Sequence, residues 1–295
     1  MSPIIDSHIH MYPPEVFTDP AGWGTAHREP WWTYCVAPPG RRTLQGWADV
    51  PRLLADMDRA GIEKCVMLGW YWEHQETCDL QNGWFIEWVR QHPDRLLGFA
   101  TVQLGAGPKT LDQLQRALDA GLCGIGELFP QVQRFTFEDD VWSQLVGIAV
   151  ERDVPINLHV SDPLAAAPSM PHPAPLKDFV NLAQRFPDAK FVLAHWGGGI
   201  PFYELNPKVR ALLKNIYYDT AATPLLYDKR VFRSTVDLIG ADRILFGTDY
   251  PLLCYPADSR ETDFERQRAE AEETLTLEER ELVMGGNLRR LLHLP

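Results

Sequence analysis

The sequence predicts an α/β fold, a single (β/α)₈ barrel of the TIM type, and two observations carry this prediction. Short apolar runs alternate with amphipathic, helix-length segments along all 295 residues. Eight such pairs can be counted, and no linker or low-complexity tract divides them. Parallel strands joined by helices need right-handed crossovers, so a closed barrel and an open doubly wound sheet are the economical arrangements. Eight units favour the barrel, with residues 1–295 forming one domain.

The predicted strands are short apolar runs, and each is followed by a helix-like stretch. The strands are expected at residues 4–6, 64–69, 96–103, 124–128, 155–160, 190–194, 216–219 and 243–246. The helices are expected at residues 50–60, 80–91, 109–120, 141–152, 176–185, 201–214, 231–239 and 278–292. Pro and Asp come before the apolar part of HPDRLLGF and of FPDAKFVL, as expected where a helix stops and a strand starts.

One connection interrupts this pattern, and it covers residues 11–47. It is rich in Pro, Gly and Trp and contains PWWTY at residues 30–34. Loops of this length in compact domains are often lids or binding loops, so we expect it to lie over the mouth of the barrel. A second aromatic run, GWYWEH at residues 69–74, follows the second predicted strand and should lie on the same rim.

Charge and composition exclude several classes of partner. The formal net charge is −12, and the pI is near 5.2, which disfavours binding to nucleic acid or to anionic membrane surfaces. No stretch approaches the ~20 apolar residues of a membrane span, and the N-terminus lacks a secretory pattern. The five cysteines are widely spaced without a Cys-x-x-Cys pair, which is typical of reduced structural thiols. We therefore expect a cytoplasmic protein that acts on a small molecule.

Metal-binding residue types fall at the ends of the predicted strands. In DSHIH, His8 and His10 are two positions apart, so on a strand they point to the same face and can hold one cation. A single buried histidine is more often a structural residue, but here several candidates coincide. The carboxyl ends of all barrel strands meet at one mouth. The later strands end near Glu127, His159, His195 and Asp249.

These motifs resemble the amidohydrolase superfamily, in the branch that includes the aminocarboxymuconate semialdehyde decarboxylase-like enzymes. The resemblance runs the full length and rests on IIDSHIH, HPDRLLGFATVQL, INLHVSD, FVLAHWGGGIPF, ILFGTDYP and GGNLRRLLHL. It implies that His8, His10, His159 and Asp249 ligate a divalent metal and that His195 stands beside it. It also favours a homodimer.

Glu127 departs from the pattern of this branch. Its decarboxylases generally lack an acid after the fourth strand, whereas hydrolases such as the TatD-like deoxyribonucleases have a Gly-Glu there that bridges two metals. Glu127 therefore favours hydrolysis, and its alternative role is to orient a ligand histidine. With one metal ion His195 is a free acid or electrophile, and with two ions Glu127 bridges them and His195 becomes a ligand.

The reaction that we expect first is hydrolysis of an amide, lactone or related bond by metal-activated water. Three imidazoles and a carboxylate suit Zn²⁺, with Mn²⁺ as an alternative. Asp249 is the candidate for accepting the proton of the water and passing it to the leaving group. The metal and His195 would polarise the carbonyl group under attack.

Substrate contacts are expected on the rim of the barrel. Trp70 and Trp72 can form an aromatic wall, and Arg41 or its neighbour Arg42 can hold a carboxylate, although all of them can equally pack or face solvent. His74 overhangs the mouth, and Trp196 follows His195 directly. Together these residues favour a small cyclic or aromatic substrate that carries a carboxyl group.

Two rival functions stay open at this level. The first is a metal-dependent, non-oxidative decarboxylase of a small aromatic or unsaturated acid, in which His195 or Asp249 protonates the carbon that loses CO₂. The second is a barrel that binds metal without turnover. An open mouth lined with aromatic residues argues against the second, because structural zinc sites are closed by four protein ligands.

Overall fold

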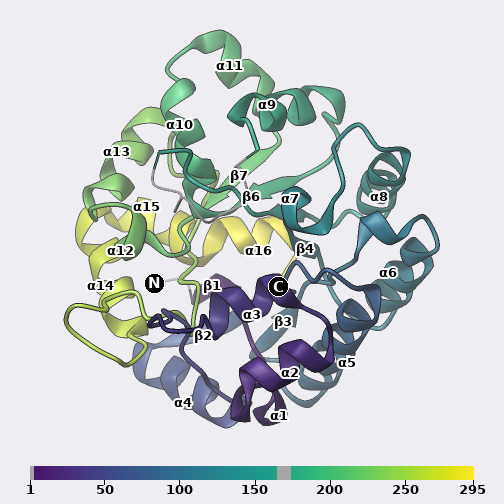
Figure 1. Cartoon of the computed structure of the whole chain (residues 1–295). Coiled ribbons are helices and arrows are strands. Elements are labelled where there is room, and N and C mark those ends of the chain that lie inside the picture. The colour runs from purple at the N-terminus through teal and green to yellow at the C-terminus, as the bar shows by residue number, and fades with distance from the viewer. Residues whose placement is uncertain (1–2, 165–173) are drawn as a thin grey trace.

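The eight predicted strands are all present and parallel, and they form a barrel surrounded by helices (Figure 1). The computed structural model describes residues 3–164 and 174–295. The third strand is shorter than predicted, because residues after Gly98 leave the ladder. The strands are β1 Ile4–Ile9, β2 Ile62–Met67, β3 Leu96–Gly98, β4 Ile125–Leu128, β5 Ile156–Leu158, β6 Phe191–Leu193, β7 Ile216–Asp219 and β8 Ile244–Leu245.

The strands are arranged as a three-stranded sheet, β1-β2-β3, and a five-stranded sheet, β4-β5-β6-β7-β8. Short contacts join the two sheets at both edges. Ala100, just after β3, bridges to Ile125 of β4, and Ile9 of β1 bridges to Tyr250, which follows β8. The Ser7 N–H also donates to the Phe246 carbonyl at 2.8 Å. The eight-stranded α/β barrel is therefore confirmed.

The helices follow the predicted order, with three corrections. Within residues 11–47, residues 14–36 form three short helices, whereas residues 37–47 contain none. Each helix begins at a proline, whose fixed φ suits the first helical turn. The predicted helix 201–214 is two helices. The sequence prediction missed the mostly charged helix at residues 264–274 and two single-turn helices at residues 130–133 and 223–226. The helices are α1 Pro14–Thr18, α2 Pro20–Ala26, α3 Pro30–Val36, α4 Val50–Ala60, α5 Gln75–Gln91, α6 Thr110–Asp119, α7 Pro130–Gln133, α8 Asp140–Glu151, α9 Leu176–Arg185, α10 Ile200–Tyr203, α11 Pro207–Leu212, α12 Thr223–Leu226, α13 Arg230–Ile239, α14 Phe264–Thr274, α15 Leu277–Glu281 and α16 Asn287–Leu291.

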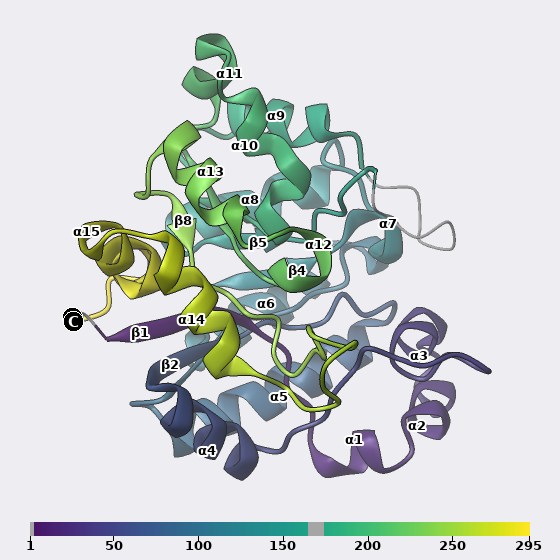
Figure 2. The same ribbon diagram turned by 90° about the vertical axis from the view of Figure 1, so that its left-hand side faces the viewer.

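The two ends of the barrel differ. Figure 2 shows α3, α7 and α12 at one end and the C-terminus at the other. At the closed end, Leu288 and Leu291 of α16 pack with Ile5 of β1 and Val192 of β6. Among the helices in the described parts of the chain, none is long and apolar enough to cross a membrane.

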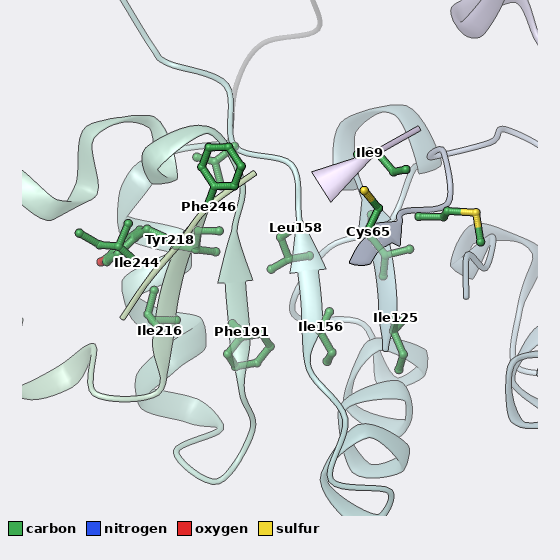
Figure 3. Packing of buried hydrophobic residues seen from close by; sticks show 14 of the residues in the cluster. Ile9, Cys65, Ile125, Ile156, Leu158, Phe191, Ile216, Tyr218, Ile244 and Phe246 are labelled. Atoms are coloured by element: carbon green, nitrogen blue, oxygen red, sulfur yellow. The ribbon is translucent and has the colours of Figure 1, made fainter. Parts of the chain in front are cut away.

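The buried side chains form two layers because neighbouring strand residues point to opposite faces. Phe191 and Leu193 of β6 belong to the large cluster that also contains helix residues, whereas Val192 between them belongs to the inner cluster. Figure 3 shows part of the large cluster along the strands, including Ile156, Leu158 and Phe191. This packing fixes the strands and thereby the positions at which their carboxyl ends present side chains.

Two strands have register irregularities where they carry candidate site residues. The pairing of β1 with β2 shifts between Asp6 and Ile9, and the pairing of β4 with β5 shifts between Ile125 and Leu128. Such bulges re-aim side chains and are common beside active sites. They lie at His8 and at Glu127, so the irregular pairing contributes to how both side chains reach the mouth.

Candidate active site

The five predicted metal-binding residues and the predicted catalytic residue His195 meet at the mouth of the barrel. Their potential ligand atoms form three overlapping groups, and within each group the atoms lie within 4.8 Å of one another. The groups are His8, His195 and Asp249; His8, His10 and Glu127; and Glu127, His159 and His195. These residues come from different strand ends, apart from the first two. His8 lies in β1, and His10 is the first residue after it.

Glu127 lies at the centre of this arrangement. Its Oε1 accepts a hydrogen bond from Nδ1 of His159 at 2.9 Å and lies 3.5 Å from Nε2 of His195. Its Oε2 lies 3.5 Å from Nε2 of His10 and 3.9 Å from Nε2 of His8. This buried carboxylate faces four imidazoles, so both predicted roles, bridging two ions and orienting a histidine, are compatible with its position.

His8 is held by a carboxylate that the sequence prediction missed. Its Nδ1 donates to Oδ2 of Asp219, at the end of β7, over 2.9 Å. Asp219 also accepts hydrogen bonds from the side chain of Asn157 and from the backbone N–H of His195. A carboxylate on the far nitrogen of a histidine fixes its tautomer and leaves Nε2 for a cation. The rule of polar residues at strand ends would have identified Asp219.

A second buried carboxylate, that of Asp6, organises the loop that carries Asp249. Asp6 accepts hydrogen bonds from the backbone N–H groups of His8 and Thr248 and from the Thr248 hydroxyl. The N–H of Asp249 donates to the carbonyl of His8 at 2.9 Å. Asp249 has a φ of 67°, which is uncommon for a residue with a Cβ. The network from Asp6 holds it in that conformation.

Burial and charge oppose each other at this site. Burial disfavours charge on His8, but the carboxylates of Asp219, Glu127 and Asp249 outweigh it and raise the pKa of His8 to about 10. Burial likewise opposes charge on Glu127, yet the surrounding histidines hold the pKa of its carboxyl well below its usual range. The cluster of acids therefore favours positive charge in their midst, whether it comes from protons or from a cation.

The donor set suits a divalent transition metal. Imidazole nitrogens together with carboxylate oxygens are the ligands that Zn²⁺ and Mn²⁺ accept, and Nε2 of His8 and Nε2 of His10 lie 3.2 Å apart, both turned to the same space. Asp249 Oδ1 lies 3.5 Å from Nε2 of His10. His159 shares a group with Glu127 and His195 rather than with His8 and His10. The four-ligand set implied by resemblance is thus spread over all three groups, and Glu127 belongs to the two that contain His10 and His159.

A cavity of about 160 Å³ opens beside these groups. It is bordered by His10, Glu127, His159, His195 and Asp249 on the metal side. The remainder of its wall comes from connections between the strands and helices. These residues are Cys35, Leu44, Gln45, Trp70, Tyr71, Pro251 and Leu252. Among the described residues, no lysine or arginine side chain lines it.

Of the five predicted substrate contacts, the structure places only Trp70 in this wall. Trp72 is fully buried and donates to Gln81, and Trp196 donates to Thr223 and packs against Phe232 in the helix layer. These two tryptophans are therefore structural in this arrangement.

The two polar candidates also lie outside the cavity. Arg41 is exposed, and its guanidinium lies over the Tyr34 ring at 4.5 Å. His74 borders a separate polar hollow with Glu73 and Arg134. The sequence prediction missed Cys35, Leu44 and Gln45 as lining residues, because nothing in their local pattern distinguishes them from the rest of residues 11–47.

Comparison with known proteins is consistent with this architecture. A family model described as amidohydrolase matches residues 5–294. Among solved structures, 5-carboxyvanillate decarboxylase from Sphingomonas paucimobilis has a TM-score of 0.75 at 15% identity, covering 100% of both chains. A dihydroxybenzoic acid decarboxylase from a Polaromonas species, with manganese and the inhibitor 2-nitroresorcinol, has a TM-score of 0.70 at 20% identity, covering 100% of this chain and 98% of that one.

A third solved structure extends the range of chemistry. 4-Oxalomesaconate hydratase from Rhodopseudomonas palustris has a TM-score of 0.67 at 20% identity, covering 98% of this chain and 95% of that one. At these identities the solved structures establish a shared fold. The family model matches nearly the whole sequence, so the chain belongs to the amidohydrolase family of metal-binding (β/α)₈ barrel enzymes.

Proposed function

We propose that this protein is a metal-dependent, non-oxidative decarboxylase of small aromatic carboxylic acids. The observation that carries the proposal is the cavity of about 160 Å³ directly beside the cluster of histidines and acids. An apolar cavity of ~150 Å³ holds a benzene molecule, so this space accommodates one six-membered ring with small substituents.

The residues that line the cavity favour one orientation of the substrate. Trp70 and Tyr71 are stacked at 4.2 Å and offer an aromatic surface, and Leu44 and Leu252 offer aliphatic groups. No cationic side chain from the described residues is available for a remote carboxylate. The carboxylate of the substrate therefore belongs at the end with the histidines, and the ring lies against the apolar wall.

The chain's own residues can carry the proton chemistry. A bound divalent cation would supply the positive charge that fixes the carboxylate of the substrate and an adjacent oxygen. The bond between the ring carbon and the carboxylate breaks, its electron pair stays on the ring carbon, CO₂ leaves, and that carbon takes a proton. His195 and Asp249 both border the cavity, and either can deliver this proton.

The relatives in the family support this choice over hydrolysis. The sequence favoured hydrolysis because of Glu127, whereas two of the similar solved structures are decarboxylases of aromatic acids. The manganese in one of them supports Mn²⁺ as much as Zn²⁺ for this site. The cytoplasmic location and the homodimer stay predictions from the sequence.

The test is turnover of a panel of hydroxylated benzoic acids by Mn²⁺-loaded and Zn²⁺-loaded protein, with CO₂ release as the measurement. We expect at least one monocyclic acid to lose CO₂ in a reaction that a chelator abolishes. If a panel of lactones and amides is consumed instead, with no CO₂ from any aromatic acid, the proposal is wrong.

Hydrolysis is the second candidate, and the position of Glu127 favours it. A carboxylate that contacts histidines of two ligand groups is suited to bridging two cations. Metal analysis of protein prepared without chelator separates the cases. Two equivalents per chain would favour the binuclear hydrolase, and one equivalent would exclude the bridging role.

A further inference from the structure

Two acids link two of the connections that form the outer wall of the cavity, which is the part away from the histidines. One connection is residues 29–36, which include α3 and contribute Cys35 to the wall. The other is residues 70–74 after β2, which contribute Trp70 and Tyr71. We propose that Glu29 and Glu73 form a reciprocal clamp that positions this wall, and that Glu29 is a positioning residue for substrate binding.

The hydrogen bonds cross between the two connections in both directions. The carboxylate of Glu29 accepts from the backbone N–H of Glu73 at 2.8 Å and from that of His74 at 3.2 Å. The carboxylate of Glu73 accepts from the backbone N–H of Trp31 at 2.9 Å. Hydrogen bonds to a carboxylate are strong, and a partly buried N–H group that loses its acceptor is left unsatisfied.

The burial of Glu29 is unusual for an acid that has no cationic partner within the described parts of the chain. Its exposed fraction is 0%, and burial raises the pKa of its carboxyl to about 7. Glu73 has an arginine nearby, since Nη2 of Arg134 lies 4.0 Å from Oε1 of Glu73. The side chain of Arg134 is mostly exposed. Burying an acid costs stability unless hydrogen bonds compensate for it. The carboxylate of Glu29 accepts hydrogen bonds from the backbone after β2 and from the Thr77 hydroxyl at the start of α5.

The two connections differ in how they are attached to the barrel. Residues 70–72 are anchored, because the Trp70 N–H donates to Gln81 and the Trp70 carbonyl accepts from Thr101. For residues 29–36, the hydrogen bonds that reach outside residues 11–47 all involve Glu29 or Glu73, among the described residues. Ring contacts of Trp32 add apolar packing but fix direction less strictly. The clamp therefore sets where α3 lies relative to Tyr71.

Cys35 provides a direct reporter of the wall. It lines the cavity from α3, and burial raises the pKa of its thiol to about 12, so the closed wall suppresses its reaction with alkylating reagents. Cys123 is a comparison thiol of similar partial exposure on another part of the barrel, and Cys65 is buried within β2. A wall that loosens should expose Cys35 alone.

The experiment measures iodoacetamide labelling of each cysteine by peptide mass spectrometry in Mn²⁺-loaded protein, for the Glu29→Gln and Glu73→Gln variants. An amide at position 29 offers one acceptor oxygen in place of two, so we expect labelling of Cys35 about tenfold faster and labelling of Cys123 unchanged. The matched control is Glu76→Gln, an exposed acid three positions after Glu73. It should behave like the unaltered protein.

Two results would overturn the clamp. One is a Cys35 labelling rate unchanged in both variants, and the other is a parallel rise at Cys65, which would mean that the barrel itself opens. A second readout is kinetic: with 2,6-dihydroxybenzoate as substrate, KM should rise about fivefold or more in Glu29→Gln while kcat stays within about twofold. A fall in kcat at constant KM would contradict a positioning role.

The inference rests on the proposed function in one respect, which is that this cavity holds the substrate. Labelling and metal content do not depend on which reaction occurs. Cys35 labelling that responds as expected supports the clamp even in a protein that releases no CO₂ from benzoates, so the two proposals can fail separately.

Discussion

The two ends of the cavity are built on different principles. At the metal end, the side chains come from strand ends, and buried carboxylates inside the barrel orient them, as Asp219 does for His8. At the outer wall, the side chains come from connections, and they are positioned by packing and by the cross-linking acids Glu29 and Glu73. We therefore expect the chemistry to depend on the rigid part of the fold, and substrate selection to depend on the part that can vary without disturbing the strands.

The largest effect should come from the metal end. Asp249→Asn keeps the size of the side chain but removes a carboxylate that faces His8 and His10 and can move a proton. We expect turnover to fall about 1000-fold or more, with the melting temperature of the chelated protein little changed. Steady-state rates and thermal unfolding check this. Turnover near that of the unaltered enzyme would remove Asp249 from the mechanism.

The stability of the protein should depend on pH through Glu29, which positions the outer wall. The folded protein holds the Glu29 proton up to about pH 7, whereas the unfolded chain releases it near 4.5. Between these values the folded state binds more protons, so this group makes stability fall as pH rises, by roughly 3 kcal/mol in total. Glu29→Gln should lack that part of the slope.

Chemical denaturation at a series of pH values measures the effect. The comparison with Glu76→Gln isolates the contribution of Glu29. Each variant lacks one glutamate, and all titrating groups besides Glu29 and Glu76 are common to both. Identical slopes in the two variants would show that Glu29 titrates normally.

A variant of Asp219 tests whether the buried carboxylates inside the barrel strengthen metal binding at the mouth. Asp219→Asn keeps a hydrogen-bond acceptor for Nδ1 of His8 but removes the charge. We expect metal affinity to weaken about 10- to 100-fold, with activity partly recovered at saturating metal. Titration with Mn²⁺ followed by calorimetry measures this. An unchanged affinity would mean that Asp219 serves folding alone.

Arg41 should give the smallest effect. It is exposed, lies over Tyr34 and does not line the cavity. Arg41→Ala should therefore change KM for 2,6-dihydroxybenzoate by less than about twofold. A large rise in KM would show that the wall closes further over the substrate and that the expectation from the sequence was right.

The same contrast explains what could be predicted from the sequence. Strand ends are visible as breaks in apolar runs, so the sequence pattern alone places His8, Glu127, His159 and Asp249 at one mouth. Glycine, proline and tryptophan in residues 11–47 indicated a special connection but not its helices, because their packing includes contacts distant in sequence, such as those of Trp23 and Trp32 with Trp72.

The individual residues of the cavity wall could not be predicted from the sequence for the same reason. Trp70 and Trp72 look equivalent in GWYWEH, yet only the first lines the cavity, since the Trp72 ring is fully buried and its indole N–H donates to Gln81. Trp196 follows a candidate ligand, but its indole turns to Thr223 in the helix layer. Local spacing cannot distinguish these directions when the backbone leaves regular structure.

The most direct test of the central claim is turnover in ¹⁸O-labelled water, with the product identified by mass spectrometry, for the benzoic acid that the metal-loaded protein consumes fastest. Decarboxylation predicts a product that has lost the mass of CO₂, carries one new hydrogen from water and contains no ¹⁸O. If the metal-loaded protein instead consumes a lactone or an amide, with all substrate carbons recovered in the products and ¹⁸O in one of them, that result would contradict decarboxylation and restore the hydrolase.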